Sequence, residues 1–115
     1  MDGPSHTLRN LFDDALPPPQ GERFDVLLRH RNLVIERIVS SDQLRPEVCV
    51  QTQDEWVLLL QGEAMLDVQG QAMHLRAGDT LFLPAGVPHT VLHTTAGTLW
   101  LAVHLQPDGE PPGGA

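Results

Sequence analysis

The stretch GDTLFLPAGVPHTVLH, residues 78–93, contains two short apolar runs separated by turn-forming residues. Gly78 and the aspartate after it suit a tight hairpin turn before the first run. Pro84 ends that run because it has no backbone N–H to donate, and Gly86 permits a turn with positive φ. His89 then opens the next run. The pattern predicts two antiparallel strands with a histidine at a strand end.

Similar strand patterns extend over residues 23–105. The runs are rich in Val, Leu and Ile, and turn residues interrupt them about every eight to twelve positions. This spacing predicts an all-β fold, either a small antiparallel barrel or a sandwich. The other runs are FDVLLRH, NLVIERIVSS, EVCVQ, EWVLLLQ, EAMLDVQ, QAMHLRA and TLWLAVHLQ.

The two ends of the chain differ from this β domain. Residues 1–22 hold four apolar side chains that could form one face of a short helix, and three prolines at 17–19 would stop that helix. We therefore expect a short helical or irregular N-terminal arm. Residues 106–115 are rich in Pro and Gly, so we expect a disordered tail.

The run EWVLLLQ is apolar on both of its faces. Val57 and Leu59 alternate with Trp56, Leu58 and Leu60, so neither face suits water. One face would meet the barrel interior. We expect the other face to be covered by a second subunit in a homodimer, and the alternative is that the N-terminal arm covers it alone.

Composition excludes several classes of protein. The chain has 115 residues, 41% of them hydrophobic, and a formal net charge of -8, which fits one small globular domain. Its few basic residues form no stripe, so nucleic-acid binding is not expected. No apolar run is long enough for a membrane helix, and the start of the chain does not resemble a signal peptide.

Cys49 is the only cysteine, so no internal disulfide can form, and we expect a cytoplasmic protein.

Residues 78–89 fit the pattern glycine-x5-proline-x-glycine-x2-histidine, and this resembles the second motif of the cupin superfamily. The first cupin motif is histidine-x-histidine-x3-glutamate-x6-glycine. Glu55 and Gly62 match its second half, but Cys49 and Gln51 stand where its two histidines belong. The resemblance spans about residues 33–105. Within the superfamily, it is more specific to small single-domain bacterial cupins of the conserved-barrel type. It implies a double-stranded β-helix (jelly-roll) barrel, a dimer and a divalent metal such as Fe, Mn, Ni or Zn.

The resemblance also implies which side chains face the barrel interior. Residues two apart on a strand share a face, so Gln51 joins Cys49, and His93 joins His89. We expect His89, Glu55, Gln51 and His93 as metal ligands, with Glu55 as ligand or general base. Thiolate ligation by Cys49 is a further alternative to an inert core thiol.

Each of these residues also has a reading without metal. His89 could hydrogen-bond Glu55 or Gln51 at the barrel mouth, Gln51 could bind a small ligand, and His93 could orient His89. His104, between Val103 and Leu105, is expected to be structural or pocket-lining.

Two functions follow from these alternatives. The first is a metal-containing cupin that binds or transforms a small polar or carboxylated metabolite by dioxygenase, isomerase or lyase chemistry. The second is a metal-free module that binds or senses a small molecule. Fold alone does not choose between them, because one barrel hosts many chemistries.

Overall fold

The structure is a computed structural model that describes residue 6 and residues 8–107. Its secondary structure consists of eight strands, and each pair of neighbouring strands is antiparallel. The all-β prediction is confirmed. The strands are β1 (Glu22–His30), β2 (Leu33–Ser40), β3 (Asp54–Gln61), β4 (Glu63–Val68), β5 (Gln71–Arg76), β6 (Thr80–Leu83), β7 (His89–Thr94) and β8 (Thr98–Leu105).

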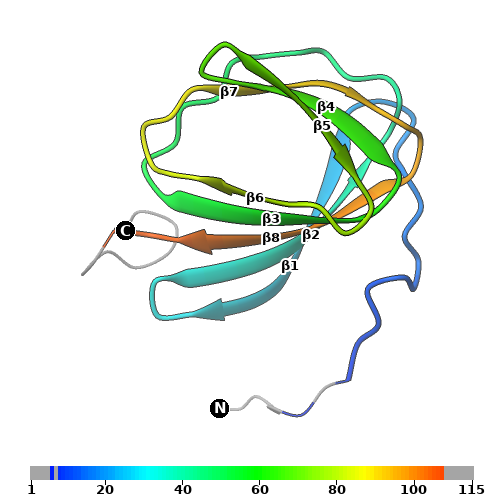
Figure 1. Ribbon diagram of the computed structural model, residues 1–115. Coiled ribbons are helices and arrows are strands. Elements are labelled where there is room, and N and C mark those ends of the chain that lie inside the picture. The colour runs from blue at the N-terminus through cyan, green and yellow to red at the C-terminus, as the bar shows by residue number, and fades with distance from the viewer. Residues whose placement is uncertain (1–5, 7, 108–115) are drawn as a thin grey trace.

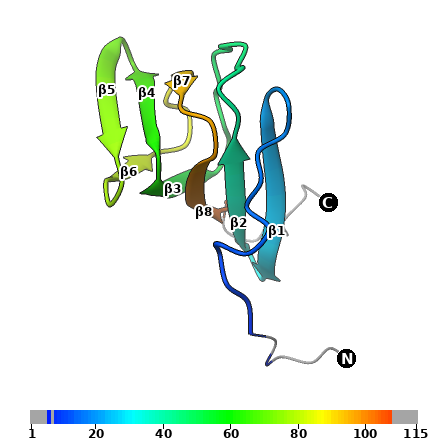
Figure 2. The same cartoon turned by 90° about the vertical axis from the view of Figure 1, so that its right-hand side faces the viewer.

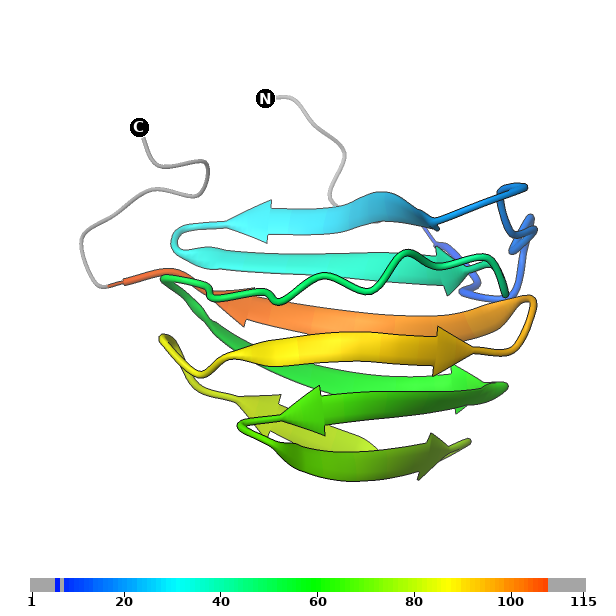
Figure 3. The ribbon, with the colours of Figure 1, turned by 90° about the horizontal axis from the view of Figure 1, so that it is seen from above.

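The strands form two sheets that face each other, as Figures 1 and 2 show. The larger sheet has the order β1-β2-β8-β3-β6, and the smaller sheet has the order β5-β4-β7. The segment 41–53 connects β2 to β3 and runs beside β7, where Cys49 forms an isolated bridge with His89 (Figure 3). This segment therefore takes the place of a fourth strand in the smaller sheet.

The hydrophobic core lies between the two sheets. It consists of alternate residues of the facing strands, as expected where each strand turns one face inward. Val57 and Leu59 of β3 are buried in it, whereas Trp56 on the opposite face is 38% exposed. The core cluster comprises Ile38, Val57, Leu59, Ala64, Leu66, Leu75, Trp100 and Ala102.

Gly62 makes the turn from β3 in the larger sheet to β4 in the smaller one. Its φ is +93°, a left-handed conformation that costs other residues free energy. A Cβ at this position would also lie 2.9 Å from the Cα of Thr98 and clash with its hydroxyl. The turn that takes the chain from β3 to β4 therefore requires the glycine of the first motif, whatever the protein binds.

The expectation of a helical N-terminal arm is wrong. Residues 11–14 form only a turn, in which the Asn10 side chain accepts a hydrogen bond of 2.8 Å from the backbone N–H of Phe12. Asp14 has φ of +53°, which interrupts any helix before the prolines are reached. The run EVCVQ also forms no strand beyond the bridge at Cys49. Most of the expected disordered tail, from residue 108 onward, lies outside the described residues.

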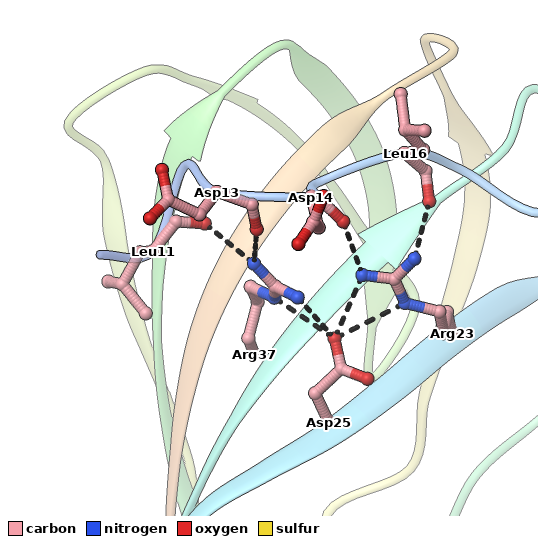
Figure 4. Close-up of polar contacts among 7 residues, drawn as sticks. All are labelled: Leu11, Asp13, Asp14, Leu16, Arg23, Asp25 and Arg37. Atoms are coloured by element: carbon pink, nitrogen blue, oxygen red, sulfur yellow. Dashed lines mark hydrogen bonds and ion pairs between the residues drawn. The ribbon is translucent and has the colours of Figure 1, made fainter. Parts of the chain in front are cut away.

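Side-chain hydrogen bonds fasten the arm to the outer face of β1 and β2 (Figure 4). Arg37 donates hydrogen bonds to Asp25 Oδ2 at 2.8 and 3.0 Å and to two carbonyl oxygens of the arm, those of Leu11 and Asp13. Arg23 donates to the same carboxylate oxygen and to the carbonyls of Asp14 and Leu16. Guanidinium groups thus replace the intrahelical bonds that the arm does not make.

The arm leaves much of the outer face of the larger sheet uncovered. Leu28 is 46% exposed and Phe82 55% exposed, and the arm's own Leu16 is 71% exposed. Among the described residues, the arm alone therefore does not cover this face. Cross-strand pairs join its apolar side chains into one row that crosses all five strands, in the order Leu28, Ile35, Val103, Trp56 and Phe82.

Candidate functional site

The two motif regions meet at one end of the barrel through backbone hydrogen bonds. In the turn after β6, the N–H of Gly86 donates to the carbonyl of Gln51 at 2.8 Å, and the N–H of Ala85 donates to Asp54 Oδ1 at 2.9 Å. Gly86 has φ of +82°, as the sequence predicted for this turn. The segment before β3 and the turn before β7 therefore hold each other in place.

Glu55 projects from β3 into the barrel interior and is 7% exposed. Its Oε1 accepts a hydrogen bond of 2.9 Å from the side-chain amide of Gln51, so the structure brings these two predicted site residues together. Burial raises the pKa of the Glu55 carboxyl above its usual value of 4.5, and the nearby His104 and His89 only partly offset this increase.

His89 begins β7 on the inner face and is 8% exposed. Its Nδ1 lies 3.3 Å from the carbonyl oxygen of Val87. Because a carbonyl only accepts hydrogen bonds, Nδ1 carries a proton, and a neutral ring then leaves Nε2 as an acceptor. Within the described part of the chain, Nε2 has no hydrogen-bond partner.

The expectation that His93 shares the face of His89 is wrong. The pairing of β7 with β4 shifts register, so Val91 lies opposite Leu66 whereas His93 lies opposite Met65. One extra residue therefore opposes β4 between Val91 and His93, and such a bulge reverses the faces that follow it. His93 is exposed on the outer side and does not join the other predicted site residues.

Cys49 lies directly opposite His89, and the two residues exchange backbone hydrogen bonds of 2.7 and 3.0 Å. Residues opposite each other in an antiparallel pair project to the same side, so the thiol is next to the imidazole. Cys49 is nevertheless exposed at the barrel mouth rather than buried in the core.

His104 belongs to a polar cluster on the inner face. Its Nε2 lies 2.9 Å from Glu36 Oε1 and 3.8 Å from Glu55 Oε2, and its Nδ1 lies 3.3 Å from the amide nitrogen of Gln53. The hydrogen bond to Glu36 raises the pKa of His104 above its usual value of 6.5, despite burial. His104 therefore touches both the candidate site and a second carboxylate behind it.

A cavity of about 530 Å³ opens between the sheets beside these residues. Its polar lining includes Gln51, Glu55 and His89. Its apolar walls come from both sheets, with Trp100 and Val57 on one side and Leu66 and Val91 on the other. A volume of this size suits a small metabolite. Another hollow, of about 690 Å³, lies between the arm and β1–β2 and contains no residue of either motif.

Sequence and structure comparisons agree with this architecture. A family model described as "Cupin domain" matches residues 47–104. The chain belongs to the cupin family. No curated protein matches this cupin. In the described residues, moreover, no helix is long and apolar enough to span a membrane.

Three solved structures illustrate the similarity. A Ralstonia eutropha JMP134 protein, provisionally named a mannose-6-phosphate isomerase, shares 34% identity with a TM-score of 0.77, over 88% of this chain and 99% of that one. An RmlC-like cupin from Shewanella frigidimarina NCIMB 400 shares 19% identity with a TM-score of 0.69, over 82% and 84%. KdgF from a Halomonas species shares 13% with a TM-score of 0.69, over 77% and 82%. The last two show similarity of fold alone.

The cupin family implies a divalent metal, but the donor set of this cupin does not form a metal centre. In the described residues, no three His, Cys, Asp or Glu side chains are grouped so that they could hold a metal ion. Gln51 replaces one imidazole and directs its amide N–H at Glu55, and His93 lies on the other side of the sheet. The residues present therefore do not fit a three-ligand site, and we derive no chemical step through a metal.

Sequence reasoning missed two carboxylates on the inner face of the larger sheet. Glu36 occupies an inward position between Val34 and Ile38, and Glu22 lines the cavity itself. The signal was a charged residue at an inward position of an otherwise apolar alternation in LVIERIVS. This signal could have been recognised only if it had been known which face of the strand points into the barrel.

Proposed function

We propose that this cupin binds a small polar metabolite in the cavity between its sheets, with Glu55, His89 and Gln51 in contact with the ligand. The observation that carries the proposal is that residues of both motifs line one cavity of about 530 Å³ with apolar walls. A few convergent polar groups in an apolar pocket are typical of small-molecule sites. The ligand need not complete a metal coordination sphere.

Proton transfer is the chemistry that such a site could perform on its ligand. Burial raises the pKa of Glu55, and the nearby His89 offers an Nε2 that has no hydrogen-bond partner among the described residues. An acid–base pair of this kind suits an isomerase-like reaction. The similarity to the Ralstonia protein supports the same class of reaction. Binding without turnover requires only the cavity.

A thermal-stability screen of small metabolites tests the binding function. Protein treated with a chelator is compared with protein reloaded with Fe, Mn, Ni or Zn. A ligand at 100 times its Kd adds about 2.7 kcal/mol of stability. Stabilisation of the chelated protein, lost in Glu55→Gln and His89→Ala, supports the proposal. Ligand binding that requires reloaded metal would instead favour the metal-dependent alternative with His89, Glu55 and Gln51 as ligands.

We also propose that two copies associate through the outer face of the larger sheet. The row of apolar side chains from Leu28 to Phe82 crosses all five strands and is partly exposed. A continuous row of partly exposed apolar side chains is characteristic of an interface. A second copy would present the same row, as a two-fold interface requires.

A further inference from the structure

The polar groups that line the cavity are mainly hydrogen-bond acceptors. Glu55 Oε1 accepts from Gln51, whereas Oε2 accepts no hydrogen bond in the described part of the chain. The nearest basic nitrogen to Oε2 is Nε2 of His104, at 3.8 Å. His89 adds Nε2 as a second acceptor without a partner among the described residues, because its Nδ1 proton faces the Val87 carbonyl.

Glu22, at the start of β1, brings a second carboxylate to the same cavity. Its Oε2 accepts a hydrogen bond from the hydroxyl of Ser40, and Ser40 Oγ in turn accepts one of 3.0 Å from Trp100 Nε1. Ser40 is fully buried and Trp100 is 4% exposed. A chain of buried donors therefore fixes the carboxylate of Glu22. Its Oε1 has no hydrogen-bond partner among the described residues and can accept a hydrogen bond from a ligand.

Donors and positive charges are scarce around this cavity. The amide N–H of Gln51 already serves Glu55. Among the described residues, three carboxylates line the cavity, those of Glu22, Glu47 and Glu55. The only guanidinium among these lining residues is that of Arg45, an exposed residue. Glu22 is close enough to Glu55 to contribute to the rise in its pKa. A ligand carboxylate would meet repulsion here and find few donors.

We propose that the cavity selects a small organic cation, in which an ammonium group on an apolar body donates hydrogen bonds to Glu22 and Glu55. An ammonium has only donors and a positive charge, so it complements an acceptor-rich and acidic lining. The apolar body packs against walls that include Phe24, Ile38 and Leu66. This inference rests on the proposed binding function and replaces the carboxylated metabolite expected from the sequence.

The test uses three probes that share one alkyl chain and differ only in the head group: n-butylamine, n-butanol and butyrate. Each is titrated at fixed salt and pH, with a chelator present, while the indole N–H resonance of Trp100 in the cavity wall is followed. We expect n-butylamine to shift this resonance saturably, with a dissociation constant at least about tenfold lower than those of the other two probes.

Two isosteric variants and one matched control locate the contact. Glu22→Gln and Glu55→Gln each remove one charge and should weaken n-butylamine binding by about tenfold or more. Glutamine at 22 still offers an oxygen to the Ser40 hydroxyl, so the fold should be kept, which the unfolding curve of the free variant checks. Glu63→Gln removes the same charge from an exposed residue outside the cavity and should leave binding unchanged.

Four results would overturn the inference. Butyrate binding as tightly as n-butylamine would show that the cavity does not select cations, although the proposed binding function would stand. Equal weakening in Glu22→Gln and Glu63→Gln would mean that only net charge matters. A Trp100 resonance that shifts with none of the probes but does shift when divalent metal is added without chelator would assign the acidic lining to metal instead. If none of the probes binds, the cation inference fails, and the metabolite screen then decides the proposed function separately.

Discussion

His104 Nε2 lies 2.9 Å from Glu36 Oε1, and both side chains are largely buried on the inner face of the larger sheet. The amide nitrogen of Gln53 lies 3.3 Å from the other ring nitrogen and can only donate, so the neutral ring donates from Nε2 to Glu36. When His104 is protonated, both ring nitrogens donate, so the Gln53 amide must turn its oxygen toward Nδ1. The pair links the candidate site to a second buried carboxylate.

This pair predicts how stability depends on pH. The pKa of His104 is raised in the folded state, so its contribution to stability is complete below its usual pKa of 6.5 and is lost as pH rises through the folded value. The raised pKa of Glu55 acts in the same direction but from a lower pH, because its contribution is complete below its usual pKa of 4.5 and is lost as pH rises through its own folded value. We expect the free energy of unfolding to fall as pH rises from 6.5, measured by urea denaturation.

The variant His104→Asn should flatten this decline. His74→Asn is its control, because His74 forms a similar pair with Glu63, at 2.8 Å, on the exposed surface. Solvent screens such a pair, so this variant should keep the wild-type pH profile. An unchanged profile in His104→Asn would contradict the assignment.

His89 and His93 should differ in their effect on ligand binding although they lie on the same strand. His89→Ala removes an acceptor from the cavity and should weaken binding of a ligand found in the metabolite screen by about tenfold. His93→Ala should change the dissociation constant by less than about twofold, because the bulge turns His93 outward. Calorimetric titration of both variants measures the difference, and equal losses would place His93 in the site.

Gly62 and Gly70 allow the cost of a close contact to be separated from the cost of a backbone conformation. Both have positive φ, but a Cβ at Gly70 would meet nothing within 4 Å. Gly70→Ala should lower the free energy of unfolding by about 1–2 kcal/mol. Gly62→Ala should cost about 1–3 kcal/mol more, because the new methyl group overlaps Thr98. Similar losses in both variants, measured by urea denaturation, would show that β3 and β4 can move apart.

The parts of the fold that follow from local chemistry could be predicted from the sequence. The turn around Gly86 and the inward position of Glu55 depend on backbone conformation and on alternation along one strand, and both agree with the structure. The position of His93 could not be predicted in this way. A one-residue bulge depends on how β7 pairs with β4, and the alternation of β7 alone contains no sign of it.

Two further differences have the same origin in tertiary contacts. EVCVQ has strand propensity, but only Cys49 finds a backbone partner, so the segment remains irregular. The arm has a helical apolar pattern, but Arg23 and Arg37 bind its carbonyl oxygens and favour an extended path. In each case a partner distant in sequence decides the conformation, and local pattern does not reveal it.

Arg37 should control whether the arm stays on the sheet. Arg37→Leu removes hydrogen bonds to Asp25 and to the carbonyls of Leu11 and Asp13. We expect trypsin to cleave after Arg9 several times faster in this variant, as local opening becomes easier. Arg29→Leu, at an exposed residue of β1, is the control and should keep the wild-type rate. Cleavage is followed by mass spectrometry, and equal rates in the two variants would refute this role of Arg37.

Trp56 belongs to the apolar row on the outer sheet face, where it lies between Val103 and Phe82 in neighbouring strands. If two copies meet here, Trp56→Glu buries a charge in the interface and should convert a dimer into a monomer, which light scattering after gel filtration measures. Leu92→Glu, at a similarly exposed residue of the smaller sheet, is the matched control and should leave the dimer intact. Because the ligand cavity lies on the opposite face of the larger sheet, the Trp56→Glu monomer should still bind n-butylamine. A wild-type protein that is monomeric at high concentration would rule out the dimer directly.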